Sequence, residues 1–201
     1  MAIHSEDLLL QLDDSEELET FLSWEEVFGN GNPVQVEVGI GKGRFLIESA
    51  QRYPAVNFLG IEWASKYLRI ARDRSLKREL DNIRFVRTDA KEFVEFFIPA
   101  SSVAAYHIYF PDPWPKKRHH KRRLFDPQFV VELERTLAEN GELWLATDHL
   151  EYFEVIVEAT EASIYLDEVH PAWPEIPTNY ETKYLAQGKP IYRRVLSKTA
   201  Q

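Results

Sequence analysis

Short apolar runs alternate along the chain with longer segments in which apolar residues recur every three or four positions. Runs of strand length cover residues 34–38, 57–62, 83–87, 103–110 and 141–147. The periodic segments between them predict helices over 44–52, 64–80, 90–97, from 127 onward, and over 152–162. Asp126 and Pro127 form a typical helix start, because an acidic cap precedes proline at the first helical position.

This alternation predicts βαβ crossovers, and therefore a mainly parallel sheet with helices on both faces. The C-terminal part departs from the pattern. Residues 164–170 and 189–197 predict two further strands, separated by a proline-rich connection and a short helix. We expect them to pair antiparallel at one edge of the sheet. The predicted fold class is α/β, a doubly wound, Rossmann-like sheet with an antiparallel edge strand.

The N-terminal segment differs in composition from the rest. Residues 1–30 carry nine Asp or Glu and no Lys or Arg, which accounts for the formal net charge of −9. Its leucines favour a short amphipathic helix or a loosely docked arm, and the turn-forming run Gly29–Pro33 ends it. We therefore divide the chain into an acidic arm, 1–33, and one α/β domain, 34–201.

Several classes of protein and site are excluded by composition. The chain has no cysteine, so it has neither disulfides nor thiolate metal sites. His119 and His120 lack a third ligand at a metal-like spacing, and we expect no metal. The apolar stretches are too short to cross a bilayer, and the start of the chain has no signal-peptide pattern. We expect a cytoplasmic protein, monomeric or homodimeric.

Three glycines, Gly39, Gly41 and Gly43, follow the first predicted strand, where the chain must turn tightly into a helix. Glu62 and Asp89 end the next two strands. Ligands of such sheets bind outside the carboxyl ends of the strands. A carboxylate at Glu62 would meet the ribose hydroxyls of an adenosine, and one at Asp89 would accept from the adenine amino group.

The spacing of the glycines distinguishes between two ligands that contain adenosine, a dinucleotide and S-adenosylmethionine. The third glycine of the dinucleotide fingerprint would fall on Arg44, and Glu37 before the loop would repel a pyrophosphate. The same carboxylate attracts the amino group and the sulfonium of S-adenosylmethionine. We therefore favour this methyl donor over a nucleotide.

A proline-stiffened loop follows the fourth strand and holds Asp112 and Trp114. A tryptophan there can stack on an extruded base, and a carboxylate can accept from a guanine. Residues 116–123 carry six fixed positive charges in eight residues. Such a run can be a solvated surface or a nuclear address, but its place beside a rigid loop favours binding of RNA phosphates.

From Val34 to Ser197 the chain resembles the bacterial tRNA (guanine-N7-)-methyltransferases, which use S-adenosylmethionine. The matching motifs are Glu37 with its glycine loop, Gly60-Ile61-Glu62, Asp89-Ala90, Pro111 to Lys116, Ala146-Thr147-Asp148, and Thr178-Asn179-Tyr180-Glu181. The resemblance implies that the cofactor is contacted by Glu37, Gly39, Gly41, Gly43, Glu62, Asp89, Ala90 and Asp112. The guanine would be contacted by Lys116, Asp148, Thr178, Asn179, Tyr180 and Glu181. The RNA would be contacted by Arg118, His119, His120, Lys121, Arg122 and Arg123.

The target that the resemblance implies is the guanine at position 46, in the variable loop of tRNA. Relatives often have a basic N-terminal segment, whereas this one is acidic. Guanine N7 has a lone pair and no proton, so methyl transfer is an in-line displacement that needs no base. We expect Asp112 and Asp148 to be catalytic by stabilising the cationic purine, although Asp148 could instead cap the helix that follows.

Two other functions are compatible with parts of this pattern. Enzymes that methylate an exocyclic amino group have an Asp-Pro-Pro-Tyr-like loop at this place, but here Trp114 stands after a single proline. A non-catalytic RNA-binding module could keep the fold as a scaffold. The intact glycine loop and the three acids at strand ends argue against it.

Overall fold

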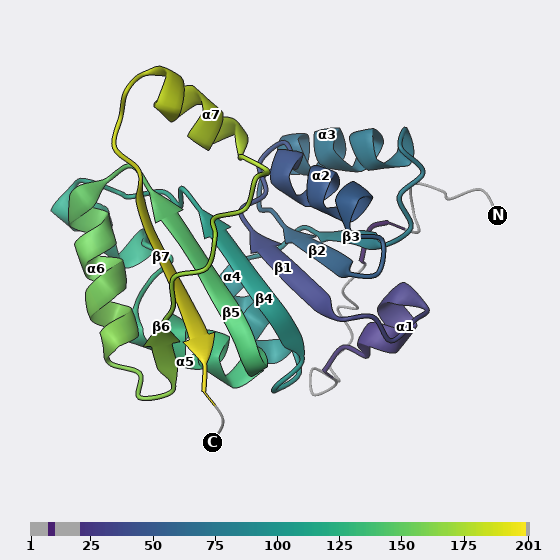
Figure 1. Ribbon diagram of the computed structural model, residues 1–201, viewed down its shortest axis with the longest axis horizontal. Coiled ribbons are helices and arrows are strands. Elements are labelled where there is room, and N and C mark those ends of the chain that lie inside the picture. Colours follow the sequence, from purple (N-terminus) through teal and green to yellow (C-terminus); the bar gives the residue numbers. More distant parts are fainter. Residues whose placement is uncertain (1–7, 11–20, 200–201) are drawn as a thin grey trace.

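In the computed structural model, which describes residues 8–10 and 21–199, the chain forms a seven-stranded sheet in the order β3-β2-β1-β4-β5-β7-β6 (Figure 1). The parallel strands are β1 (Val34–Val38), β2 (Asn57–Ile61), β3 (Ile83–Val86), β4 (Val103–Tyr109) and β5 (Leu137–Thr147). The antiparallel part consists of β6 (Leu166–Glu168) and β7 (Tyr192–Lys198). The predicted fold class is confirmed.

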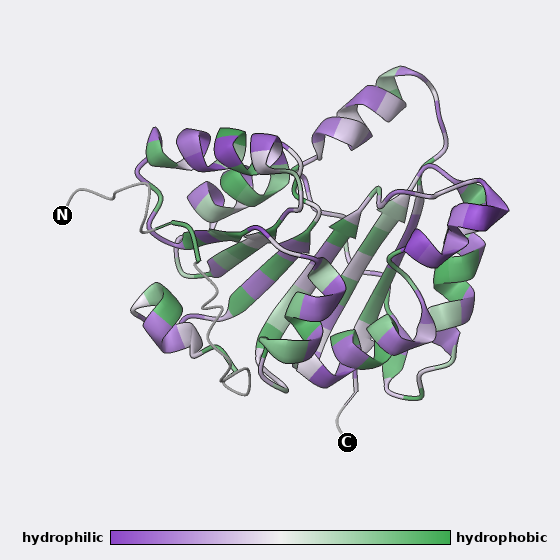
Figure 2. Ribbon diagram, turned by 180° about the vertical axis from the view of Figure 1, so that it is seen from behind, coloured by the Kyte–Doolittle hydropathy of each residue, from purple (hydrophilic) through white to green (hydrophobic). Residues whose placement is uncertain are grey.

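Helices cover both faces of this sheet. They are α1 (Trp24–Phe28), α2 (Arg44–Arg52), α3 (Ser65–Leu76), α4 (Ala90–Phe96), the 3-10 helix η1 (Lys117–Arg122), α5 (Pro127–Thr136), α6 (Leu150–Glu161) and α7 (Asn179–Ala186). Helices α2 and α3 bury Leu46 and Leu68 on one face, and α4 to α6 bury Phe93, Phe129 and Tyr152 on the other. Figure 2 shows the central strands with long hydrophobic stretches and the helices with alternating hydrophobic and hydrophilic positions.

Most element boundaries agree with the prediction, and α2 agrees at both ends. Asp126 caps α5 as expected, because its side chain accepts the N–H of Phe129. Helix α3 was predicted through residue 80 but ends at Leu76. Beyond it, Glu79 takes a left-handed φ of 55°, which directs the buried Leu80 into the core. Strand β5 begins four residues early, since 137–140 join it beside an irregularity in β4.

The antiparallel edge was predicted, and the structure adds how it is built. Strand β7 inserts between β5 and β6, and β6 is only three residues long. Because β7 runs against β5, Tyr192 pairs with Thr147 and Arg193 with Ala146. The beginning of β7 therefore lies at the carboxyl edge of the parallel strands. This arrangement brings α7 to that edge (Figure 1).

Parts of the N-terminal arm pack against the sheet. The N–H of Phe85 donates to Leu8 (2.8 Å) and that of Leu10 donates to Phe85 (2.8 Å), so this piece docks beside β3. Helix α1 follows and ends at Gly29, whose φ of 71° confirms the predicted turn. Of the leucines that suggested a short amphipathic helix or a docked arm, those at 8–10 are not helical and lie against β3, and the rest of the stretch, 1–7 and 11–20, lies outside the described residues. Over the part of the chain described here, no helix is long and apolar enough to cross a membrane.

Candidate active site

The glycine loop between β1 and α2 is held by a carboxylate of the neighbouring strand. Gly41 has a φ of 53°, which favours glycine, and its N–H donates to Oε2 of Glu62 (2.9 Å). The other oxygen of Glu62 accepts the N–H of Ala64 (2.8 Å), at the start of α3. Gly43 is required because of close packing, since a Cβ at this position would lie 2.7 Å from the Cβ of Ala71. The loop therefore packs α2 closely on α3.

A cavity of about 500 Å³ opens beside this loop, at the carboxyl ends of β1, β2 and β3. This volume is in the range of sites for small molecules. Its lining brings together predicted residues from four places in the chain. They are Gly39, Glu62, Asp89, Ala90, Asp112, Lys121, Arg122 and Arg123. Asp89 also caps α4, accepting the N–H groups of Lys91 (2.8 Å) and Glu92 (3.4 Å). Gly41, Gly43 and Glu37 do not line this cavity.

Glu37 is buried in β1, just before the loop. Burial raises the pKa of its carboxyl well above the usual range, and the Glu62 carboxylate raises the pKa further. A hydrogen bond from the backbone of Leu46 opposes both effects. Its Oε2 has no hydrogen-bond partner among residues 8–10 and 21–199. A buried acceptor without a partner is costly, and a ligand with a cationic amino group or a sulfonium would supply the missing charge. The site therefore fits S-adenosylmethionine.

Trp63 is a lining residue that sequence reasoning missed. It follows Glu62 directly, lines the cavity, and is 68% exposed. An exposed indole beside the Glu62 carboxylate provides a flat apolar surface for a heterocycle. The signal was present in the sequence, as an aromatic residue immediately after the acid that ends the second strand.

The loop after β4 is conformationally unusual. Phe110 and Trp114 have φ values of 54° and 43°, a left-handed conformation that non-glycine residues seldom adopt. Such strain is typical of functional sites. Asp112, between them, is exposed and lines the cavity. The Trp114 ring also lines it, and already contacts Arg122 (guanidinium carbon to ring centroid 5.1 Å) and His119 (centroids 5.7 Å apart).

The basic run does not act as one surface. Residues Lys116, Lys117, Arg118, Lys121 and Arg122 are exposed, and His119 and His120 are half-buried. Arg123 is different, since its side chain is only 5% exposed. Its guanidinium donates to the carbonyl of Pro113 (2.8 Å) and to Glu151 (2.9 Å). In the structure the donors of Arg123 brace the loop from within, and its predicted contact with RNA stays a prediction.

Asp148 and α7 meet at the carboxyl edge. Asp148 lies 3.4 Å from Nζ of Lys189, which in turn lies 4.5 Å above the ring of Tyr184. The alternative role for Asp148, capping α6, is wrong, because His149 is the cap and accepts the N–H of Tyr152. The side chain of Asp148 is 23% exposed and stays available to a ligand.

Residues 178–181 have unequal roles in α7. Thr178 caps the helix by accepting the N–H of Glu181, and the buried Glu181 pairs with Arg193 on β7. Tyr180 is 49% exposed, and its ring lies 6.1 Å from that of Phe110. The segment therefore presents Tyr180 outward and uses Thr178 and Glu181 to hold it in place. Among the described residues, no cluster of three or more His, Asp, Glu or Cys could bind a metal.

Comparison with known proteins gives consistent matches. A family described as "Putative methyltransferase" matches residues 31–194. The tRNA (guanine-N(7)-)-methyltransferase of Listeria monocytogenes serotype 4b is 42% identical over 177 residues, 85% of this chain and 82% of that protein. The enzyme of that name from Geobacillus thermodenitrificans is 39% identical over 178 residues, with the same coverage of both chains.

Among solved structures, the aminoglycoside resistance methyltransferase NpmB1 superimposes with a TM-score of 0.60 at 19% identity, covering 87% of this chain and 91% of its own. At that identity the likeness concerns the fold alone. The two sequence relatives go further, since each is matched over most of its length. The chain belongs to the family of bacterial tRNA (guanine-N7-)-methyltransferases.

Proposed function

We propose that the protein transfers the methyl group of S-adenosylmethionine to N7 of the guanine at position 46, in the variable loop of tRNA. The observation that carries the proposal is the position of Asp112. It lines the cofactor cavity, and the exposed cations at 116–118 follow it within a few residues of the same loop. A carboxylate at the methyl donor is thereby joined directly to a surface that suits RNA phosphates.

The residues that line the cavity, together with Glu37 outside that lining, offer a group for each part of the cofactor. Glu62 is placed for the ribose hydroxyls and Asp89 for the adenine amino group, while Trp63 offers a face to the ring. The orphan oxygen of Glu37 suits the cationic end. When bound, S-adenosylmethionine supplies a methyl group carried on a sulfonium. The protein's own contribution is to position that group and to provide negative charge beside it.

The guanine is proposed to bind between the loop after β4 and α7. Asp112 and Asp148 approach this space from two strand ends, and the purine gains positive charge when N7 is methylated. Fixed carboxylates stabilise that charge without reorganisation of solvent. Asn179 and Tyr180 are the members of 178–181 left to contact the base, and Lys116 lies exposed at the start of η1 for the adjacent phosphate.

The proposal is tested with tRNA transcripts that differ at position 46 alone. Purified protein is incubated with labelled S-adenosylmethionine and a transcript that carries guanine or adenine there, and the modified atom is mapped by mass spectrometry and by the chain cleavage that N7-methylguanine permits. We expect label in the guanine transcript only, at N7. Label on an exocyclic nitrogen would favour the amino-methylating alternative, and tRNA binding without transfer would favour the scaffold alternative.

The same mapping on tRNA from cells tests which guanine is methylated, separately from whether the protein methylates N7. Bulk tRNA from a strain that lacks the gene is compared with wild-type tRNA. Loss of the modification at position 46 alone is the expected result. Loss at another guanine would keep the N7 activity and overturn the proposed position.

A further inference from the structure

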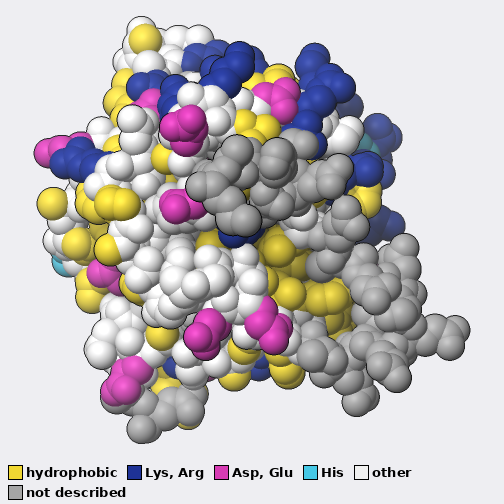
Figure 3. Space-filling model, turned by 90° about the vertical axis from the view of Figure 1, so that its right-hand side faces the viewer, with side chains coloured by type: hydrophobic (Ala, Val, Ile, Leu, Met, Phe, Trp, Pro, Cys, Tyr) yellow, Lys and Arg dark blue, Asp and Glu magenta, His cyan; other side chains and the backbone are white. Residues whose placement is uncertain are grey.

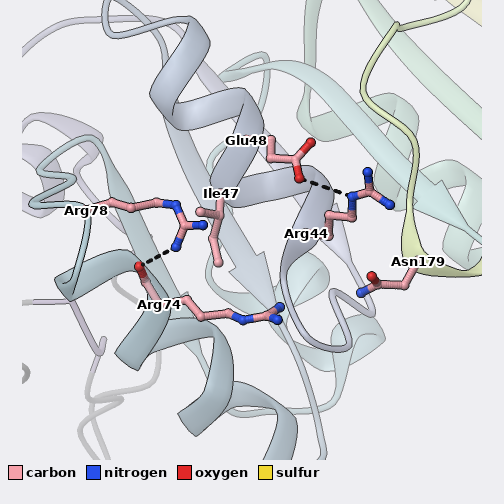
Figure 4. Close-up of a pocket in the computed structure, with 6 residues that line it drawn as sticks. All are labelled: Arg44, Ile47, Glu48, Arg74, Arg78 and Asn179. Atoms are coloured by element: carbon pink, nitrogen blue, oxygen red, sulfur yellow. Dashed lines mark hydrogen bonds and ion pairs between the residues drawn. The ribbon is translucent and has the colours of Figure 1, made fainter.

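A second cavity, of about 330 Å³, adjoins the outer side of α2. Its lining comes from three helices that are distant in sequence: Arg44, Ile47 and Glu48 from α2, Arg74 and Arg78 from α3 and its end, and Asn179 from α7 (Figure 4). Arg74 and Arg78 face Arg44 and Asn179 across it. None of these residues lines the cofactor cavity.

This cavity carries an excess of positive charge. Glu48 is its one acidic residue, and Oε1 of Glu48 lies 3.1 Å from Nε of Arg44. Arg74 donates one N–H to the carbonyl of Lys42 (3.1 Å), and Arg78 donates one to the carbonyl of Arg74 (3.1 Å). Neither forms an ion pair with a carboxylate elsewhere in the described residues. Since a guanidinium has five N–H donors, most donors of both remain open.

Helix electrostatics explains only part of this arrangement. Cations near the C-terminus of α3 stabilise that helix, which accounts for the presence of Arg74 and Arg78. It does not account for Arg44, the first residue of α2, where a cation is disfavoured and where the first turn has no acidic residue. Arg44 is also fixed in place, because its Nη1 donates to Thr182 on α7 (2.8 Å). Three arginines from α2 and from α3 and its end thus line one cavity with a single carboxylate, Glu48, among the described lining residues, and a bound anion would relieve the excess of positive charge.

The surroundings indicate which anion. Residues 65–79, which span α3, contain six Lys or Arg and two acids. Figure 3 shows that most Lys and Arg side chains on this face of the molecule lie along its upper edge. Arg74 and Arg78 are exposed, so an extended ligand can run across them. Guanidinium groups bind phosphate oxygens in pairs. Asn179 joins the cavity to the segment 178–181 that we propose to contact the guanine.

We propose that this arginine cavity, lined by Arg44, Arg74 and Arg78, binds backbone phosphates of the tRNA on the far side of α7 from the basic run. The inference rests on the proposed function, since it concerns how the same substrate is held. It assigns the tRNA two separate phosphate contacts, one at η1 and one at the α2–α3 face, with the target guanine between them.

The test measures binding of an unmodified tRNA transcript to the full-length protein over a series of salt concentrations. The variant Arg74→Ala/Arg78→Ala is compared with Arg69→Ala/Arg72→Ala, which removes two cations from α3 without touching the cavity. We expect the cavity variant to raise the Kd about tenfold at moderate salt. Each phosphate contact contributes about 0.7–0.9 to the slope of log affinity against log salt, so the slope should flatten by roughly 1.4–1.8. The control should flatten it much less.

Two further measurements keep the outcomes distinct. Calorimetry with S-adenosylhomocysteine should give wild-type affinity for both variants. This result would show that the substitutions leave the cofactor cavity intact. Arg74→Lys/Arg78→Lys should recover most of the binding, because charge is kept. Equal losses of tRNA affinity in the cavity and control variants would mean that the positive charge of α3 attracts RNA without a specific site, and would overturn the inference. An unchanged salt slope in the cavity variant would overturn it too. Neither result affects the proposed function, which fails if wild-type protein does not methylate tRNA at guanine N7, or methylates it at a guanine other than the one at position 46.

Discussion

The Glu62 carboxylate accepts the N–H of Gly41 across 2.9 Å, so the residue that we propose to contact the ribose also holds the glycine loop. Its second oxygen accepts the N–H of Ala64 at the start of α3. One side chain therefore ties together the end of β2, the loop after β1 and the beginning of the next helix. If Glu62 contacts the ribose as proposed, cofactor binding is coupled to local order in the loop.

Replacing Glu62 tests that coupling. Glu62→Ala should weaken binding of S-adenosylhomocysteine by roughly 1.5–3 kcal/mol, because a charge-assisted contact is lost. Affinity for tRNA should change little, since the basic residues lie elsewhere. Asp81→Ala, an exposed acid before β3, is the matched control. Calorimetry provides the measurement, and wild-type affinity in Glu62→Ala would exclude the ribose role.

Asp112 is expected to act on the rate of methyl transfer. Asp112→Asn keeps the size of the side chain and removes the charge beside the purine. Single-turnover transfer should slow by about 10²–10³-fold, with the circular dichroism spectrum unchanged. Asp167→Asn, an exposed acid on β6, should react like wild type. If Asp112→Asn also reacts at the wild-type rate, this carboxylate has no electrostatic role.

Glu37 should make stability depend on pH. Burial raises its pKa in the folded protein above 4.5, so above that pH the folded chain holds a proton that the unfolded chain has lost. Stability should therefore fall as pH rises from about 4.5 toward the raised pKa. Glu37→Gln should remove this decline in thermal unfolding curves, whereas Glu139→Gln at an exposed position should keep it. Parallel curves for Glu37→Gln and wild type would contradict the assignment.

The same carboxyl should release its proton when a cationic ligand binds. A positive charge beside Oε2 favours the ionised form, so the pKa falls on binding. Calorimetry of S-adenosylmethionine in buffers of different ionisation enthalpy should report net proton release at a pH between the free and bound pKa values. Glu37→Gln should abolish the release. A buffer-independent heat in wild type would count against this role.

The basic run should divide into two kinds of residue. Arg118→Ala/Lys121→Ala should flatten the salt slope of tRNA binding by roughly 1.4–1.8 and leave stability unchanged, because both side chains are exposed. Arg123→Ala should instead destabilise the fold by about 1–3 kcal/mol, since it leaves the Pro113 carbonyl and Glu151 without their donor. Thermal unfolding and salt titration of both variants measure the two effects. A wild-type melting temperature for Arg123→Ala would refute its bracing role.

The sequence predicted best those features that depend on local geometry. The glycine loop follows from the positive φ angles that its turn requires, and Asp126 from the N–H groups that a helix start leaves open. The acids Glu62, Asp89 and Asp112 met at one cavity because parallel strands end at one edge. Their individual contacts with cofactor or guanine stay predictions.

Features created by packing between distant elements were not predicted. Counting charges could not separate Arg123 from its neighbours, because its burial depends on α6 and on the loop after β4. The arginine cavity likewise exists only after α3 packs on α2 and α7 crosses to Arg44. Trp63 is the opposite case. It is a large apolar side chain that is exposed, and the pattern of apolar positions in the sequence does not distinguish it from a buried one.

The insertion of β7 between β5 and β6 has a consequence for synthesis of the chain. As residues leave the ribosome, β1 to β5 emerge in an order that lets each parallel strand find its neighbour. Strand β6 emerges next, yet among the described residues its one pairing is with β7. Strand β7 begins at residue 192, whereas β6 begins at 166, so the delay is about 1–5 seconds at roughly 5–20 residues per second. Glu181, which precedes β7, likewise has no Arg193 to pair with until that strand emerges. A nascent chain therefore completes the half that contains the glycine loop first, and α7 gains its anchor on β7 only when this last strand closes the sheet.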